Sequence, residues 1–337
     1  MPDMDDDAET VPGLADVLAA RRRIEPHLPR TAFRRYPRLA DLVGTDVWVK
    51  HENHHPTAAL KVRGGINLVS QLDAAERDRG LITASTGNHG QSIAHAARLF
   101  GVPATICVPE GANPLKLAAI RAHGATIVVH GRDFDVAREE CERIADRDGL
   151  RYIHSGNEPH LIAGVGTATL EMLEDEPELD VIVVPIGGGS GAAGACIVAK
   201  AIRPEITVIG VQSSAAPAAQ RSWSGRELVE DRMETFAEGL ATRVAFELPQ
   251  RILWQHLDDF VLVGEDDLRA ATVRMIAATS NLVEPAGAAA LAGALALRER
   301  LAGKRVALVC SGGNISPAQL RDLLATDAGR AAAEDGA

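Results

Sequence analysis

The sequence predicts an α/β protein made of two doubly wound lobes, each built on a parallel sheet. Short β-rich runs alternate with helical runs, which is typical of βαβ units with helices on both faces of a sheet. The alternation falls into two series along the chain. A length of 337 residues with 46% hydrophobic content is enough for two domains of roughly 100–200 residues each.

The first series contains four β-rich runs, each with a helical run after it. The β-rich runs are residues 46–50, 81–85, 103–109 and 126–131. The helical runs are residues 61–80, 90–101, 114–124 and 134–149. Because parallel strands end at the same edge of a sheet, we expect the loops after them to converge on a ligand-binding cleft.

The second series is less regular. Its β-rich runs are residues 180–186, 207–212, 260–264 and 305–310. A glycine loop and a helix follow the first run, and a looser segment over 213–249 follows the second. Helices from about Glu265 and after Ser316 follow the other two. The first and last dozen residues of the chain are predicted to be disordered.

Composition excludes several classes of protein. The formal net charge of −11 argues against nucleic acid or an anionic membrane as the main partner, because both attract basic surfaces. No run approaches the roughly 18 apolar residues of a membrane span, and the acidic start MPDMDDDAETVPG does not resemble a signal peptide. We therefore expect a cytoplasmic protein. The four scattered cysteines, with no CxxC pair, suggest neither a disulfide framework nor a zinc site.

The β-rich run over 180–186 leads into a loop in which residues 189–194 read GSGAAG, a match to GxGxxG. In dinucleotide-binding folds this loop seats a pyrophosphate, and an acidic residue about 20 positions further on binds the ribose. Here the next β-rich run ends at Gln212, which is not acidic. Backbone N–H groups in a glycine nest at a helix start bind any phosphate. The loop therefore predicts a phosphate site, with an NAD-dependent oxidoreductase as an alternative.

Residues 51–55, HENHH, match the HExxH pattern of zinc proteases. That chemistry requires both histidines on one face of a helix. The segment continues a β-rich run, and Pro56 disfavours helix in the residue before it. We interpret the segment as a polar exit from a strand into a loop and predict no metal there.

Four segments outside the glycine loop carry groups with chemistry of their own. Lys61 lies where HPTAALKVRGG enters a helix, and STGNHGQ over 85–91 follows the next strand. EPAGAA over 284–289 and CSGGN over 310–314 follow later. A lysine amine, a turn rich in hydroxyls and amides, and a distant glycine nest match what pyridoxal phosphate requires. These requirements are an amine for a Schiff base, donors for a substrate carboxylate, and a phosphate cup.

These five segments, in this order between Lys50 and about Ser316, resemble the fold-type II pyridoxal phosphate enzymes. This is the family of threonine and serine dehydratases and serine racemases, with a fold like that of the tryptophan synthase β subunit. The resemblance implies that Lys61 carries the cofactor. It implies further cofactor contacts from Asn88, Gly187, Gly188, Gly189, Ser190, Glu284 and Ser311. It implies substrate contacts from Ser85, Thr86, Gly87 and His89.

The resemblance also implies a domain organisation. Residues 1–70 and 158–337 are expected to form a large cofactor-binding domain, and residues 71–157 a small mobile domain that closes over the substrate. A homo-oligomer, expected to be a dimer, is the predicted assembly. Some assignments stay open: Glu284 is either a helix-start acid favoured by the helix dipole or a neighbour of the cofactor ring. Ser311 is either a loop cap or a partner of the ring nitrogen, and His89 is either structural or catalytic.

The chain departs from the family pattern at several positions. Relatives usually have Phe at the position of Leu60 and often Gly at the position of Ala58. The fourth glycine of the phosphate loop is Ser190, and Val165 stands where relatives often have Gln. Some relatives bind a divalent cation on carboxylates just after the strand that here ends at Gln212. This chain offers no carboxylate there, and we predict no metal site.

Together these features predict a pyridoxal phosphate-dependent ammonia-lyase of a 3-hydroxy amino acid, with L-threonine or L-serine as the expected substrate. Lys61 is expected to remove the α-proton, after which the β-hydroxyl leaves and a 2-oxo acid and ammonia are formed. An amino acid racemase is the alternative within the family, because Thr86 is expected on the opposite face of the cofactor. threo-3-Hydroxyaspartate or a bulkier 3-hydroxy amino acid is a substrate variant. A non-catalytic ligand-binding α/β protein is an alternative outside the family.

Overall fold

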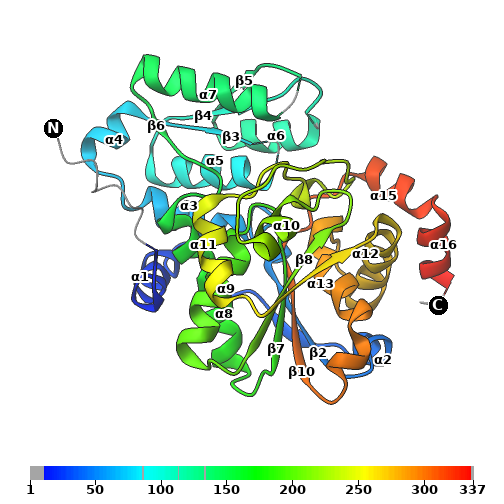
Figure 1. Ribbon diagram of the computed structural model, residues 1–337. Coiled ribbons are helices and arrows are strands. Elements are labelled where there is room, and N and C mark those ends of the chain that lie inside the picture. The colour runs from blue at the N-terminus through cyan, green and yellow to red at the C-terminus, as the bar shows by residue number, and fades with distance from the viewer. Residues whose placement is uncertain (1–10, 86, 113, 133, 335–337) are drawn as a thin grey trace.

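The computed structural model describes residues 11–85, 87–112, 114–132 and 134–334 of the chain. The strands in this part form two sheets, a six-stranded sheet of order β1-β2-β10-β7-β8-β9 and a four-stranded sheet of order β5-β4-β3-β6. Figure 1 shows the two sheets in two lobes, the smaller one with α4, α5, α6 and α7 at the top of the view. The predicted α/β fold with two parallel sheets is confirmed.

The six-stranded sheet joins strands from both ends of the chain. Its strands are β1 (Phe33–Arg35), β2 (Asp46–His51), β7 (Val181–Pro185), β8 (Thr207–Ser213), β9 (Asp259–Val263) and β10 (Arg305–Cys310). Only the pairing of β1 with β2 is antiparallel within this sheet, and β10 lies between β2 and β7. The central strands are almost entirely apolar because helices cover both faces.

Two groups of helices cover the six-stranded sheet. One face packs against α1 (Leu14–Ile24), α8 (Pro159–Asp175), α9 (Ser190–Ile202) and α11 (Glu247–His256). The other face packs against α2 (Pro37–Val43), α12 (Glu265–Thr279) and α13 (Pro285–Ala296). Figure 1 shows these two groups on opposite sides of the sheet. The loops that follow these strands therefore start from a sheet that is packed against helices on both faces.

The four-stranded sheet is parallel throughout. It contains β3 (Leu81–Ala84), β4 (Ala104–Val108), β5 (Thr126–Val129) and β6 (Arg151–Tyr152). Its helices are α4 (Ala74–Arg79), α5 (Asn88–Phe100), α6 (Pro114–Ala122) and α7 (Phe134–Asp148). Successive side chains of a strand face opposite sides, so Leu81 packs with α5 and α6 while Ile82 packs with α7. Between the lobes, α3 (Lys61–Val69) packs against both α5 and α8.

The remaining described elements are short. They are η1 (Glu52–His54), α10 (Ala218–Gly225), η2 (Glu238–Leu240), α14 (Arg298–Leu301), α15 (Pro317–Leu324) and α16 (Asp327–Glu334). The prediction of disorder in the last dozen residues is wrong for α16, because its Ala332 is buried in an apolar cluster with Val273 and Leu323. Residues 1–10, predicted to be disordered, lie outside the described residues. None of the described helices is long and apolar enough to cross a membrane.

Candidate active site

A cavity of about 740 Å³ lies between the two lobes at the carboxyl ends of their strands. Each predicted site residue that the structure describes lines it. These residues are Lys61, Ser85, Gly87, Asn88, His89, Gly187, Gly188, Gly189, Ser190, Glu284 and Ser311. Thr86, the remaining predicted site residue, lies outside the described residues. Five segments that are distant in the sequence therefore meet at one site, as the fold class predicts.

Lys61 is the first residue of α3, and its position is set by two contacts with the end of β10. The Leu60 N–H donates to the Ser311 carbonyl at 2.9 Å, and Ala59 forms a bridge with Gly312. The Lys61 amine lies 2.7 Å from Ser190 Oγ, and burial lowers its pKa to about 8. A larger fraction of the amine is therefore neutral near pH 7 than for an exposed lysine, as a nucleophilic lysine requires.

Ala58 shows why relatives often have glycine at this position. Its φ is +51°, in the left-handed region that most residues disfavour. The Gly313 N–H donates to the Ala58 carbonyl at 2.9 Å, which helps to hold this conformation against the end of β10. The departure from the family pattern thus keeps the backbone shape at the cost of a conformation less suited to alanine.

The three glycines between β7 and α9 are each required for a different reason. A Cβ on Gly187 would lie 2.2 Å from the Gly239 carbonyl oxygen, and a Cβ on Gly188 would lie 2.3 Å from the Phe246 ring. Gly189 has φ +90°, which favours glycine. Ser190 then begins α9, and free N–H groups at a helix start attract a phosphate. The loop is therefore a backbone cup whose shape leaves no room for these side chains.

Asn88, Glu284 and Asn314 form a polar chain between the two lobes. Asn88 Nδ2 donates to Glu284 Oε1 at 2.6 Å, and Asn314 Nδ2 donates to Asn88 Oδ1 at 2.8 Å. Glu284 precedes α13 as its N-cap residue, and burial raises the pKa of its carboxyl group. Glu284 is thus both a helix-start acid and a cavity residue, so the two interpretations of it do not exclude each other. The Ser311 hydroxyl donates to the Ala286 carbonyl over a long distance, 3.4 Å.

The turn after β3 presents backbone and hydroxyl groups to the cavity. Ser85 Oγ accepts the Gly87 N–H at 3.2 Å and the Gly90 N–H at 2.9 Å, so it shapes the turn and keeps its own proton for another acceptor. His89 Nε2 lies 3.0 Å from Thr83 Oγ1, whose proton goes to the Ile153 carbonyl. His89 Nε2 must therefore be the donor, and this contact favours a structural role for the His89 side chain.

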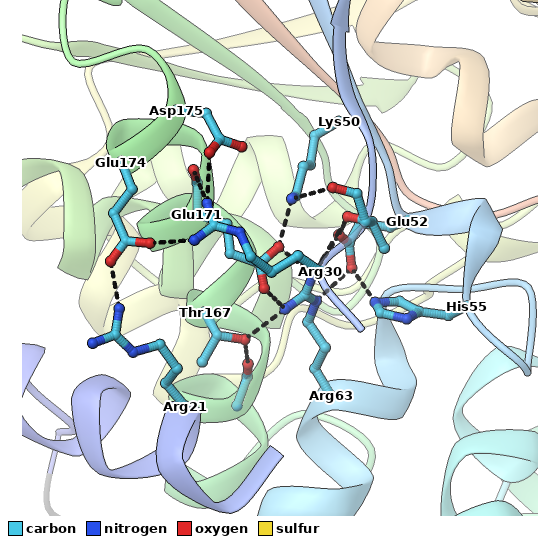
Figure 2. A network of polar contacts seen from close by, with 12 residues as sticks. Arg21, Arg30, Lys50, Glu52, His55, Arg63, Thr167, Glu171, Glu174 and Asp175 are labelled. Carbon is cyan, nitrogen blue, oxygen red and sulfur yellow. Dashed lines mark hydrogen bonds and ion pairs between the residues drawn. The ribbon is translucent and has the colours of Figure 1, made fainter. Parts of the chain in front are cut away.

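A buried charge network surrounds Arg63 of α3 (Figure 2). Arg63 pairs with both Glu52 and Glu171, and its five donors find oxygen partners at 2.7–3.4 Å. Lys50 Nζ donates to Glu171 at 2.5 Å, and His55 lies 3.0 Å from Glu52. Glu52 belongs to a 3₁₀ turn and not to an α-helix, as expected from the rejection of a zinc motif. We call Lys50, Glu52, His55, Arg63, Thr167 and Glu171 the Arg63 network.

Several cavity residues escaped the sequence analysis. Lys116 of α6 forms an ion pair across the cleft with Glu238 of η2. His154 and Phe246 pack edge to face, with ring centroids 4.8 Å apart. The available signal for His154 was its place just after β6, in the same parallel sheet as the strand that leads to Ser85. Nothing in the local sequence around Phe246 marked it as a neighbour of the glycine loop.

Gln212 does not offer the acidic side chain of a dinucleotide site. Its Oε1 accepts the Gln220 N–H at 3.1 Å, and its Nε2 lies 3.4 Å from Thr242 Oγ1, so the buried amide links two loops. Nearby, Ser213 Oγ donates to Glu265 at 2.5 Å. Among the described residues, no three His, Cys, Asp or Glu side chains gather in a metal-binding arrangement. The absence of a metal site stays a prediction.

The cavity fits pyridoxal phosphate on three features of its own. The glycine cup excludes side chains where a phosphate is expected to bind, and a helix begins at its edge. The buried Lys61 amine has a hydroxyl partner and no carboxylate partner among the described residues. Ser311 and Asn88 line the same cavity with polar side chains. These residues would hold the phosphate, the aldehyde carbon and the ring of the cofactor.

Comparisons with known proteins agree with this fit. L-threonine ammonia-lyase of Thermotoga maritima is 37% identical over 303 residues, which cover 90% of this chain and 75% of the relative. L-threo-3-hydroxyaspartate ammonia-lyase of Saccharomyces cerevisiae is 34% identical over 306 residues, covering 90% of this chain and 94% of the relative. The structure of serine racemase from Dictyostelium discoideum matches with a TM-score of 0.86 and 31% identity, covering 91% of this chain and 100% of the other.

The family model described as pyridoxal-phosphate dependent enzyme matches residues 24–312, which include four of the five motif segments and the first three residues of the fifth. The predicted cofactor and the predicted relationship to threonine dehydratases and serine racemases are thereby confirmed. The NAD-dependent alternative and the non-catalytic alternative find no support in these relatives. On its cavity, its glycine cup and this match, the chain belongs to the family of pyridoxal phosphate-dependent enzymes.

Proposed function

We propose that the protein is an ammonia-lyase that converts a 3-hydroxy amino acid, with L-threonine and L-serine as the expected substrates, to a 2-oxo acid and ammonia. The observation that carries this proposal is the Lys61 amine, which is buried in the cavity, directed to the phosphate cup and of lowered pKa. The names of the relatives support the reaction class, because two of them are ammonia-lyases of 3-hydroxy amino acids.

Each group of the site has a distinct task in this proposal. When bound, the cofactor withdraws electrons from the α-carbon of the substrate. Lys61 Nζ holds the cofactor and takes the α-proton, while the N–H groups from Gly187 to Ser190 bind the phosphate. Asn88 and Ser311 orient the ring, with Glu284 holding Asn88. Ser85 and the backbone from Gly87 to His89 bind the substrate carboxylate; Thr86 is assigned to this turn on sequence alone.

The second candidate reaction is racemisation, because the serine racemase structure covers 91% of this chain and each of the two ammonia-lyases covers 90%. Elimination is expected to dominate because Thr86 adds a methyl group and a stiffer χ1 to the hydroxyl that serves racemases. Chiral chromatography of residual L-serine, run beside a 2-oxo acid assay, decides between them. If D-serine appears faster than 2-oxo acid, the racemase alternative replaces this proposal.

The direct test uses the purified holoenzyme. We expect a visible absorption band that borohydride removes, and 2-oxo acid formation from a panel that contains L-threonine, L-serine and L-threo-3-hydroxyaspartate. The last compound is included because of the yeast relative. A protein that carries the cofactor but releases no ammonia from any member of the panel would overturn the proposal.

Three further expectations accompany this function. The small lobe over 71–157 is proposed to move as a unit when substrate binds, with the Lys116–Glu238 ion pair as one contact across the cleft. A dimer is the proposed assembly, to be measured by light scattering. The proposed compartment is the cytoplasm, to be checked by fractionation of the source cells.

A further inference from the structure

His154 is held in one tautomer by the turn that follows it. Its Nδ1 accepts the Gly156 N–H at 3.0 Å and the Asn157 N–H at 2.9 Å. A ring nitrogen that accepts two backbone donors carries no proton of its own, so the proton of the neutral ring is on Nε2. Asn157 Oδ1 in turn accepts the Leu248 N–H at 3.1 Å, which fixes the turn against α11 of the larger lobe.

The His154 ring is also held neutral. Burial, together with Arg138 and Lys61, lowers the pKa of His154 to about 4, and Glu142 opposes this shift. At neutral pH the ring therefore offers one N–H donor and no positive charge. His89 has the opposite arrangement, because its Nε2–H is used by Thr83 and its Nδ1 is buried without a partner among the described residues.

The Nε2–H of His154 is available to a ligand. It has no hydrogen-bond partner among the described residues, and it is not one of their buried unpartnered atoms, so solvent reaches it. The ring lines the cavity together with Lys61. Phe246 lies between His154 and the glycine cup, because the ring that packs against His154 also fills the space beside Gly188. His154 is thus about one aromatic ring away from the expected phosphate.

We propose that His154 is a specificity-determining residue whose Nε2–H donates a hydrogen bond to the oxygen on C3 of the substrate. This inference rests on the proposed function and extends it, since it explains the selection of substrates with an oxygen at that carbon. A site built to donate to an oxygen discriminates strongly against analogues that lack it, because the donor is then left unpaired.

The chemical role of this hydrogen bond follows from the elimination itself. Lys61 takes the proton from Cα, and the electron pair left behind forms the double bond between Cα and C3. The C3–O bond breaks and its electron pair leaves with the oxygen, which takes up one proton in the site and departs as water. Lys61 gains one proton from Cα and the departing oxygen takes up one proton, so the number of protons in the site does not change. His154 keeps its own proton and stabilises the charge that develops on the departing oxygen.

The test uses two substitutions of His154, each of which keeps the function of only one of the two ring nitrogens. In His154→Asn, Oδ1 takes the place of Nδ1 and still accepts the Gly156 and Asn157 N–H groups, but the donor at the Nε2 position is lost. In His154→Gln, the side-chain amide reaches the Nε2 position and restores a donor there. Each variant holoenzyme is assayed with L-serine and with 3-chloro-L-alanine, whose chloride leaves without a hydrogen-bond donor.

We expect His154→Asn to lose about 100–1,000-fold in kcat for L-serine, the usual range for one donor at a developing charge. The loss for 3-chloro-L-alanine should be less than threefold, and His154→Gln should recover part of the serine activity. In addition, ¹⁵N NMR of the wild-type ring should show a bare Nδ1 and a protonated Nε2 at pH 7, with the cofactor present or absent.

Two kinds of result would overturn this role. An equal loss with both substrates in His154→Asn, no loss with either, or a protonated Nδ1 contradicts the assignment of His154 while ammonia release by the wild type leaves the proposed function intact. A wild-type holoenzyme that releases ammonia from no member of the panel of 3-hydroxy amino acids overturns the proposed function, and the role of His154 fails with it.

Discussion

The first turn of α3 carries two basic residues, Lys61 and Arg63, whose pKa values are shifted in opposite directions. Lys61 faces the cavity with Ser190 Oγ as its hydrogen-bond partner, and burial lowers its pKa to about 8. Two residues later, Arg63 is buried more completely than Lys61, yet Glu52 and Glu171 outweigh the effect of burial and raise its pKa. The difference lies in the partners and not in the depth of burial.

This comparison separates a structural charge from a chemical one. Buried charges are stable when each is paired and hydrogen-bonded, and Figure 2 shows Arg63 with its donors filled. A buried charge left without a counterion shifts its pKa toward the neutral form, and such groups gather at functional sites. We therefore expect changes at Lys61 to remove activity with little effect on stability, and changes at Arg63 to do the reverse.

The largest effect is expected for Lys61→Ala. Without its amine the protein should not retain the cofactor covalently and should lose at least about 10,000-fold in kcat, or about 5.4 kcal/mol. Far-UV circular dichroism should stay close to the wild type, and the melting temperature of the apoprotein should not fall, because no paired charge is broken. Near-wild-type turnover would contradict both the assignment of Lys61 and the comparison.

The next effect is expected for Arg63→Met. The substitution leaves the carboxylates of Glu52 and Glu171 buried and short of partners, which typically costs about 3–5 kcal/mol. The matched control is Arg321→Met, since Arg321 is exposed and its pair with Asp322 should contribute less than about 1 kcal/mol. Urea denaturation of both apoproteins measures the difference, and similar midpoints would show that the Arg63 network does not stabilise the fold.

The sequence predicted the cavity residues around Lys61 better than it predicted the Arg63 network. Lys61, the glycine cup and Ser311 lie in short segments whose composition indicates their chemistry, and all of them line the cavity. The Arg63 network escaped prediction because its members come from β2, η1 and the residue after it, α3 and α8, which only the tertiary fold brings together. His154 escaped for a related reason, because its role depends on which ring nitrogen the following turn binds.

A smaller effect should appear in the pH dependence of stability. The folded-state pKa of Lys61 is about 8 and its ordinary value is 10.5, so the unfolded apoprotein binds more protons between these pH values. Stability contributed by this group therefore rises with pH through that window, by about 2 kcal/mol between pH 7 and 9.5. Lys61→Met should lack this rise. Urea denaturation of both apoproteins at several pH values measures it, and parallel curves would contradict the lowered pKa.

The smallest effect is expected for Gly188→Ala, which tests the cup without touching either cation. Gly188 needs no special φ, and the reason for glycine there is the Phe246 ring, 2.3 Å from the position of an added Cβ. The ring is also packed against Gly156 and His154, so it cannot move away freely. Such overpacking costs about 1–2 kcal/mol, and cofactor binding should weaken about tenfold.

The matched double variant distinguishes crowding from loss of a backbone contact. Phe246→Leu replaces the ring with a smaller aliphatic side chain and so makes room beside Gly188. In that background Gly188→Ala should weaken cofactor binding by much less than in the wild type. Because the two side chains are in contact, their effects should not add, and the coupling should favour the double variant. The dissociation constant of pyridoxal phosphate, titrated by absorbance into the four apoproteins, measures this coupling. Additive losses would mean that Phe246 does not limit the cup, and that the phosphate instead requires the Gly188 backbone for another reason.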